Sequence, residues 1–159
     1  MSSILAAIQN KNLDLVVFTV DGVMCALRVD EVQEIKRVVQ INEVYHAPEY
    51  VRGVINLRGQ IVTVIDLRKK LNYPTCEVSE SSRMVVVKRD NEQIGLLVDT
   101  IEDTFVARAE DILKPPSNIQ GAESRFFIGV CKTPESLVTI LDLKAILEKD
   151  GILKDENKE

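Results

Sequence analysis

Short apolar runs recur along the chain, and turn-forming residues separate them. Runs of this length bounded by Gly, Asn or Asp are typical of β-strands joined in hairpins. Asp21-Gly22 and Arg58-Gly59 are two-residue hairpin turns, and two more hairpins are joined by 90–92 and 132–136. The pattern predicts strands over residues 15–20, 23–29, 34–41, 52–57, 60–67, 83–89, 93–101, 126–131 and 137–143.

Helical signals are few and short. Pro48 suits a first helical turn and predicts a short helix over 48–51. Asp66 and Asp142 each precede a run that an aspartate can cap, which predicts a second helix after residue 66 and a third over 143–150, ended by Gly151. The polar tail that follows has no apolar anchor and is expected to fray.

An internal repeat organises these elements. Residues 15–32 align with 84–101 at an offset of 69, and residues 53–71 align with 129–147 at an offset of 76. The two alignments hold 13 identities in 37 positions, where chance gives about two or three. The chain is therefore predicted to contain two copies of one small strand-rich unit.

The repeat predicts an all-β fold of two small barrels related by a pseudo-two-fold axis, with short helices that include one near the C-terminus. Residues 1–159 form one domain, with subdomains mainly from 15–71 and 83–148 and an undetermined exchange of strands between them. The junction of the barrels is expected to offer a docking groove. Eight repeat-related side chains are expected in the core: Leu27, Val29, Val62, Ile65, Leu96, Val98, Val138 and Leu141.

Composition and charge exclude several classes of protein. The formal net charge is −5 and only 4% of residues are aromatic, which argues against nucleic-acid binding and against a base-stacking surface. No run approaches the ~20 apolar residues of a membrane span, and the first residues do not resemble a signal peptide. We therefore expect a cytoplasmic protein without direct membrane insertion.

The sequence lacks the residue patterns that catalysis and metal binding usually require. The sequence has one histidine, His46, and three cysteines without a CxxC spacing. Cys25 and Cys131 align with isoleucines in the sister copy, so they are interpreted as core residues, and Cys76 is expected in an exposed loop. The sequence predicts no enzyme activity, no metal and no cofactor.

The two copies differ at one hairpin. Residues 56–59 read NLRG in the first copy, whereas 132–135 read KTPE in the second. Arg58 at such a turn would hold a planar, permanently charged guanidinium at a fixed surface point. It is either a partner contact or a solvated charge beside residues that merely suit a turn.

Several motifs carry a resemblance to a known family. VQEI at 32–35 and PEYVRGVINLRGQIVTVIDLR at 48–68, together with VVFTVDG at 16–22 and LLVDTIEDT at 96–104, resemble the CheW family of chemotaxis coupling proteins. The resemblance covers about residues 15–148. It implies two five-stranded SH3-like barrels side by side, and a non-catalytic adaptor that joins the cytoplasmic tip of a chemoreceptor to the regulatory domain of a chemotaxis histidine kinase. Recruitment to receptor arrays at the inner face of the membrane follows from the same resemblance.

The resemblance also implies partner-binding residues. Val32, Glu34 and Ile35 belong to the VQEI element and Arg58 to NLRG, while Gly95 and Ile101 match positions on the receptor-binding face; the expected set is Val32, Glu34, Ile35, Arg58, Gly95 and Ile101. Glu34 and Arg58 are expected to be neighbours. Ala26 and the segment 113–127 depart from the family pattern, which puts contacts made by loops in doubt.

Two alternatives remain at this stage. A small barrel can bind oligonucleotides or oligosaccharides, although that needs an aromatic or basic face. An enzyme could use carboxylates such as Asp66 and Glu31 as acid and base. The cap interpretation of Asp66 and Asp142 competes with the second alternative.

Overall fold

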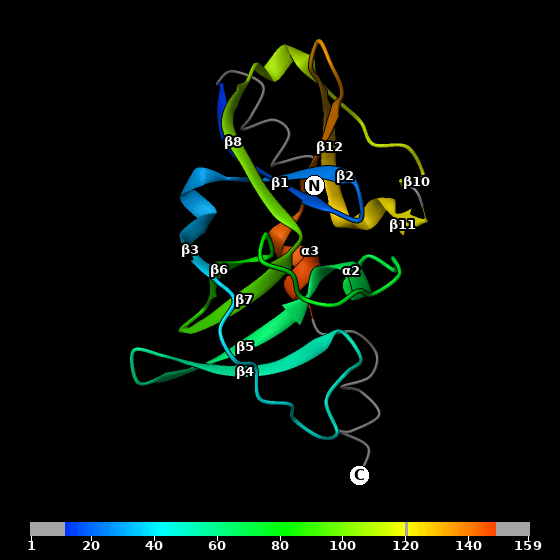
Figure 1. Ribbon diagram of the computed structural model, residues 1–159. Coiled ribbons are helices and arrows are strands. Elements are labelled where there is room, and N and C mark those ends of the chain that lie inside the picture. Colours follow the sequence, from blue (N-terminus) through cyan, green and yellow to red (C-terminus); the bar gives the residue numbers. More distant parts are fainter. Residues whose placement is uncertain (1–11, 120, 149–159) are drawn as a thin grey trace.

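The computed structural model describes residues 12–119 and 121–148 as two curled sheets with short helices between them (Figure 1). One sheet has the order β8 (Thr100–Ala107), β1 (Leu13–Val20), β2 (Val23–Arg28), β13 (Leu137–Leu141), β12 (Phe127–Lys132) and β9 (Ile112–Leu113). The other has the order β3 (Val32–Arg37), β6 (Arg83–Arg89), β7 (Glu92–Val98), β5 (Gln60–Asp66) and β4 (Val51–Leu57). The smaller elements are β10 (Asn118–Ile119), β11 (Ala122–Glu123), α2 (Leu67–Lys70), α3 (Leu143–Leu147) and the 3-10 turns η1 (Val29–Glu31), η2 (Ala109–Asp111) and η3 (Ser124–Phe126). The predicted all-β fold is confirmed.

Strand pairing follows the sequence repeat position by position. In the parallel pair of β5 and β7, Thr63 lies opposite Ile94. In the parallel pair of β13 and β2, Thr139 lies opposite Cys25. These positions are related by the two repeat offsets, so the same register is built twice. The pseudo-two-fold symmetry inferred from the sequence is therefore present in the sheets.

The sheets exchange strands between the copies. β8 belongs to the second copy but pairs with β1 of the first, and β3 belongs to the first copy but pairs with β6 of the second. Each sheet consequently combines strands from 15–71 with strands from 83–148. The two ranges describe the repeat in the sequence, and neither forms a sheet alone.

Both sheets curl until their edges approach each other. Beyond β3, the backbone of Asn42 exchanges two hydrogen bonds with Val54 of β4, at 2.9 and 2.8 Å. In the six-stranded sheet, the two edge strands β8 and β9 follow one another in the chain with only Arg108 and η2 between them. Each sheet thus forms a partly open barrel rather than a fully hydrogen-bonded closed one.

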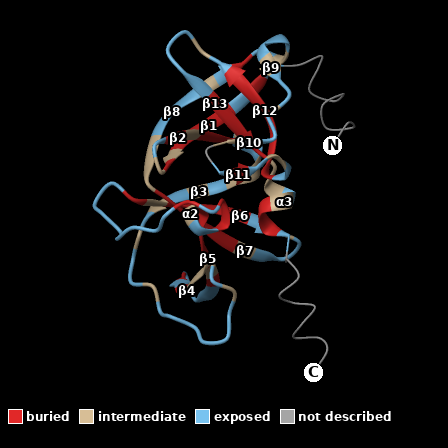
Figure 2. Ribbon diagram, turned by 90° about the vertical axis from the view of Figure 1, so that its right-hand side faces the viewer, coloured by how far each residue is buried: buried red, intermediate tan, exposed pale blue. Residues whose placement is uncertain are grey.

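Buried apolar side chains form three cores, and Figure 2 shows the buried residues as red stretches of the strands in both sheets. One lies within each curled sheet, and the largest lies between the sheets, where Phe18, Leu67 and Phe127 are fully buried. This packing fills the junction, so the expected groove there is a core. The expected core residues are buried, with the exception of Val29.

Asp66 and Asp142 cap the helices that follow them. The Asp66 carboxylate accepts a hydrogen bond from the Arg68 backbone N–H, and Asp142 accepts one from Ala145. Both predicted caps are confirmed, which accounts for the recurrence of aspartate at this position. The last helix is shorter than the predicted 143–150, because α3 ends at Leu147 and Glu148 is already extended. Gly151 and the predicted fraying of the tail lie outside the described residues.

Three predictions of local structure were wrong. Residues 48–51 form a turn closed by a hydrogen bond from Val51 to the Pro48 carbonyl, and Val51 already begins β4. The run over 93–101 divides into β7 and β8, because the chain crosses to the other sheet at Asp99. The strand expected over 34–41 spans Val32–Arg37, since it begins directly after η1.

Arg68 of α2 clamps the two sheets together. Its guanidinium donates to Asp99 at 2.6 Å and to Asp21 at 3.0 Å. Asp21 lies in the turn between β1 and β2, and Asp99 joins β7 to β8. The three groups are partly buried, and their hydrogen bonds tie the six-stranded sheet to α2. Within the described residues, no helix is long and apolar enough to cross a membrane.

Candidate functional site

Glu34 and Arg58 form an ion pair where the two edges of the five-stranded sheet approach each other. Glu34 lies in the edge strand β3, and Arg58 lies in the turn between β5 and the other edge strand, β4. Two parallel hydrogen bonds join them: Arg58 Nη1 donates to Glu34 Oε1 at 3.3 Å, and Nη2 donates to Oε2. Lys36 Nζ lies 3.9 Å from the same carboxylate. The hydrogen bonds from Arg58 lower the pKa of Glu34, and Glu34 raises the pKa of Arg58. The expected proximity of the two residues is confirmed.

The hairpin between β4 and β5 aims the guanidinium. Arg58 has φ 51° and Gly59 has φ 83°, the left-handed pair that two-residue hairpin turns require. The Asn56 side-chain oxygen accepts a hydrogen bond from the Gly59 backbone N–H at 2.9 Å. An arginine in this conformation is uncommon. The turn fixes the backbone of Arg58, and the two hydrogen bonds to Glu34 orient its guanidinium.

Apolar side chains lie beside this pair in the chain. Val29 and Ile35 are 42% and 40% exposed, and both flank Val32 on the η1–β3 segment. Val29 was expected in the core because its sister, Val98, is a strand residue. Val98 is 1% exposed, whereas Val29 begins η1 and leaves the sheet. Sequence reasoning missed this exposed valine, because the repeat is intact there in the sequence and only the structure shows the 3-10 turn η1 that the second copy lacks.

Val32 and Ile101 occupy equivalent positions in the two copies. Val32 lies opposite Val87 and Ile101 lies opposite Phe18, in registers related by the repeat. Both side chains are partly buried and pack against the central core. They lie on different sheets, and each is only partly accessible to solvent, at the edge of the central core.

Gly95 is buried in β7 and is not a surface residue. It lies in register with Val86 of β6, which in turn lies opposite Glu34. A Cβ at Gly95 would lie 2.6 Å from Met84 Sδ. The structure thus separates Gly95 from the exposed pair, and any influence on a partner runs through packing of the sheet.

The cysteines and histidine offer no reactive cluster. Cys25 and Cys131 are buried and Cys76 is exposed, as predicted. Burial raises the pKa of Cys25 to about 12. His46 is exposed in a loop. Among the described residues, no three His, Cys, Asp or Glu side chains are grouped so that they could hold a metal ion.

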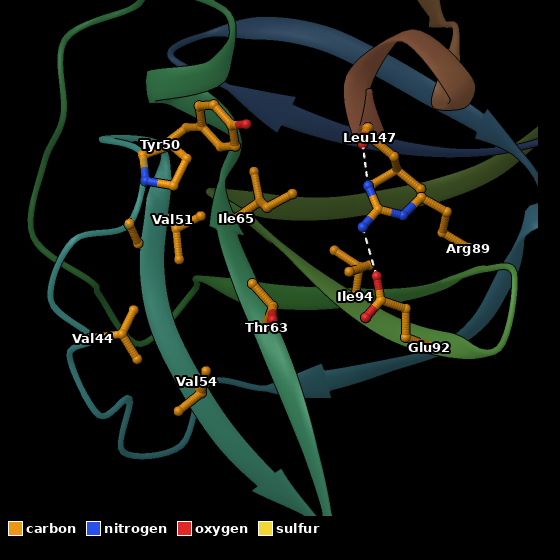
Figure 3. Close-up of a pocket in the computed structure, with 12 residues that line it drawn as sticks. Val44, Tyr50, Val51, Val54, Thr63, Ile65, Arg89, Glu92, Ile94 and Leu147 are labelled. Carbon is orange, nitrogen blue, oxygen red and sulfur yellow. Dashed lines mark hydrogen bonds and ion pairs between the residues drawn. The ribbon is translucent and has the colours of Figure 1, made fainter. Parts of the chain in front are cut away.

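An apolar pocket of about 370 Å³ opens beside β4 and β5 (Figure 3). Val54, Tyr50 and Ile94 contribute to its walls. Arg89 lies at its margin, where it donates to the Leu147 carbonyl and to Glu92 Oε1, the latter at 2.6 Å. Arg89 and Glu92 therefore neutralise each other within the lining of this pocket, and we call it the neutral pocket.

Comparison with known proteins places this geometry in context. Residues 14–151 match the family model described as CheW-like domain. The chain is 31% identical over 137 residues to "Chemotaxis protein CheW" of Bacillus subtilis (strain 168), covering 86% of this chain and 88% of that protein. It is 28% identical over 146 residues to "Chemotaxis protein CheW" of Thermotoga maritima, covering 89% and 95% respectively.

A solved structure matches the fold as well. The "Crystal structure of scaffolding protein TtCheW from Thermoanaerobacter tengcongensis" superposes with a TM-score of 0.80 and 29% sequence identity. The match covers 89% of this chain and 91% of that chain. Sequence and fold similarity therefore extend over nearly the same residues.

Proposed function

The chain belongs to the CheW-like family, and on that premise we propose that it couples chemoreceptors to a histidine kinase in chemotaxis. It is a non-catalytic scaffold protein of chemotaxis. In the proposed role, one surface binds the cytoplasmic tip of a chemoreceptor and another binds the regulatory domain of the kinase. The complex would lie in the cytoplasm, at the inner face of the membrane.

The observation that carries the proposal is the fixed, exposed ion pair of Glu34 and Arg58. Val29 and Ile35 are exposed on the same η1–β3 segment, and Ile35 points to the other face of β3 from Glu34. Contact centres combine an arginine with apolar groups, and a few such residues supply most of the binding energy. We name the pair of Glu34 and Arg58 the partner face, and we infer that Val29, Val32 and Ile35 provide a separate contact along the same segment. The ion pair holds the guanidinium in one orientation before binding, which reduces the entropy lost on association.

Gly95 and Ile101 have a different role in this proposal. Gly95 sets how closely β7 approaches Met84 of β6, and Ile101 packs against the central core. Gly95 shapes the five-stranded sheet that carries the partner face, and Ile101 belongs to the six-stranded sheet that packs against it through the central core. Substitutions there should act on partner binding through stability or strand position.

Binding of oligonucleotides or oligosaccharides is not favoured. The net charge is −5, and phosphate binding depends on an excess of basic groups. Tyr45 is the one aromatic residue among the large hydrophobic side chains that are exposed in the described part of the chain. A single exposed ring does not make a stacking surface.

A bridging experiment tests the proposal. A tagged cytoplasmic receptor fragment is immobilised, and the purified kinase regulatory domain is applied with and without the chain. The proposal predicts that the chain increases retention of the kinase domain in proportion to its own retention. Binding of neither partner would overturn it. Binding of only one partner would leave a scaffold of chemotaxis proteins but would contradict the coupling role.

A further inference from the structure

The neutral pocket lies where the described part of the chain ends. Leu147, the last residue of α3, lines the pocket together with Val54 and Ile94 (Figure 3). Val44, another residue of its wall, is 39% exposed. Contact between apolar walls and water is unfavourable, so a segment that covers this pocket would stabilise the fold.

Two cationic side chains fix the end of α3 beside the pocket. Arg89 donates a hydrogen bond to the Leu147 carbonyl, and Lys70 Nζ donates one to the Glu148 carbonyl at 3.2 Å. Lys70 Nζ also lies 3.9 Å from the centre of the Tyr50 ring, which is part of the pocket wall. The last carbonyls of a helix have no partner within the helix, so these contacts determine the point from which the chain continues.

The sequence that follows brings apolar side chains within reach of the pocket. Residues 149–159 read KDGILKDENKE, in which every residue after Leu153 is polar. From Glu148 to Ile152 the chain can span up to about 14 Å, whereas a sphere of about 370 Å³ is about 9 Å across. Ile152 can therefore reach across the pocket, and Gly151 before it allows the backbone to turn.

The first copy of the repeat has a comparable anchor after its helix. Tyr73 follows α2 as residue 149 follows α3, and its hydroxyl donates a hydrogen bond to the Ile119 carbonyl at 2.7 Å. Ile119 lines a hollow on the six-stranded sheet whose Val130 is the repeat equivalent of Val54 in the neutral pocket. In the second copy, position 149 is a lysine and the apolar pair comes three residues later. The segment after α2 is thus held beside one hollow, which is a precedent for the segment after α3.

We propose that Ile152 and Leu153 fill the neutral pocket, so that residues 149–153 form a strap that the chain closes over its own sheet. The two side chains would contact Val54 and Ile94, while the charged residues on either side of them stay in water. The closed strap excludes other apolar ligands from the pocket. Its release would expose an apolar site of about 370 Å³ on the five-stranded sheet.

Nuclear magnetic resonance of the full chain tests the position of the strap. With the methyl groups of Ile, Leu and Val labelled, we expect nuclear Overhauser contacts from Ile152 and Leu153 to Val54 and Ile94. A sample that mixes labelled and unlabelled chains distinguishes contacts within one chain from contacts between two chains. The proposal predicts that the contacts arise within one chain.

Paired variants test whether the apolar side chains are the cause. Ile152→Ser with Leu153→Ser should shift the methyl resonances of the pocket and lower Tm by at least about 3 °C, because two apolar side chains return to water. Lys154→Ser with Asp155→Ser is the matched control, since it alters two adjacent residues and keeps the net charge. The control should leave the pocket resonances in place and Tm within about 1 °C of the unmodified chain.

Three results would overturn the proposal. One is the absence of contacts between the apolar pair and the methyl groups of the pocket. Another is equal change of Tm and of pocket resonances in the two paired variants, because that would leave no specific part for the apolar side chains. The third is a set of contacts found only between chains, in which case the segment fills the pocket of a second copy.

Discussion

Replacement of Gly95 by alanine tests whether this residue acts through packing. The added Cβ would lie 2.6 Å from Met84 Sδ and 2.7 Å from Cγ, whereas carbon contacts favour about 3.5–4.0 Å. Met84 is fully buried within the five-stranded sheet, so it must shift by about 1 Å against close-packed neighbours. Overpacking of this kind costs about 1–3 kcal/mol of unfolding free energy.

Thermal unfolding and a double-mutant cycle measured by urea unfolding test this cost. In the thermal experiment, Gly95→Ala should lower Tm by roughly 3–10 °C. Met84→Ala removes both atoms that the new methyl group meets, so the double variant should be more stable than the sum of the single effects predicts, by at least ~0.5 kcal/mol. Strict additivity would refute the packing argument. So would a Gly95→Ala variant of unchanged stability that binds partners weakly, because that pattern indicates a direct surface contact.

Three further predictions concern the clamp, the ion pair and the thiols. Arg68→Met should lower the free energy of unfolding by about 2–4 kcal/mol, because it leaves two carboxylates without their cation; urea unfolding at unchanged stability would contradict the clamp. Arg58 lowers the folded-state pKa of Glu34, so their ion pair should be intact at neutral pH and lost only as the pH falls through that lowered pKa. The Glu34 carboxyl resonance should therefore titrate at a lower pH in the unmodified chain than in Arg58→Asn. A thiol reagent should modify Cys76 alone in the native chain, since burial raises the pKa of Cys25 and Cys131; modification of all three before unfolding would contradict their burial.

Much of the fold follows from local sequence because the repeat specifies each register twice. Thr63 and Thr139 occupy equivalent positions in the two parallel strand pairs, and the turn residues Asp21 and Asp90 both adopt positive φ. Exchange of strands between the copies does not follow from the repeat. It depends on where β3 and β8 leave their own hairpins, which is decided by packing between the sheets rather than by local pattern.

The candidate site is predictable to a similar degree. The motifs that contain Glu34 and Arg58 identify residues that the structure joins by two hydrogen bonds. The repeat alignment places Val29 in the core together with Val98, but a 3-10 turn exposes Val29. Gly95 belongs to the same motif-based set, yet its burial depends on Met84 in a neighbouring strand. Alignment identifies positions, while solvent exposure is set by tertiary contacts.

The affinity of Arg58→Asn for the receptor fragment and the kinase regulatory domain tests the partner face most directly. Asn-Gly suits this turn better than Arg-Gly, so the variant removes the guanidinium and should keep Tm within about 3 °C of the unmodified chain. The matched control is Arg108→Asn, because Arg108 is 61% exposed and ion-paired, as Arg58 is at 60%. Calorimetric titration should show at least a tenfold loss of affinity for one partner with Arg58→Asn, and less than a twofold change with Arg108→Asn, which removes only an exposed charge. Unchanged affinity of Arg58→Asn for both partners would contradict the assignment of the partner face.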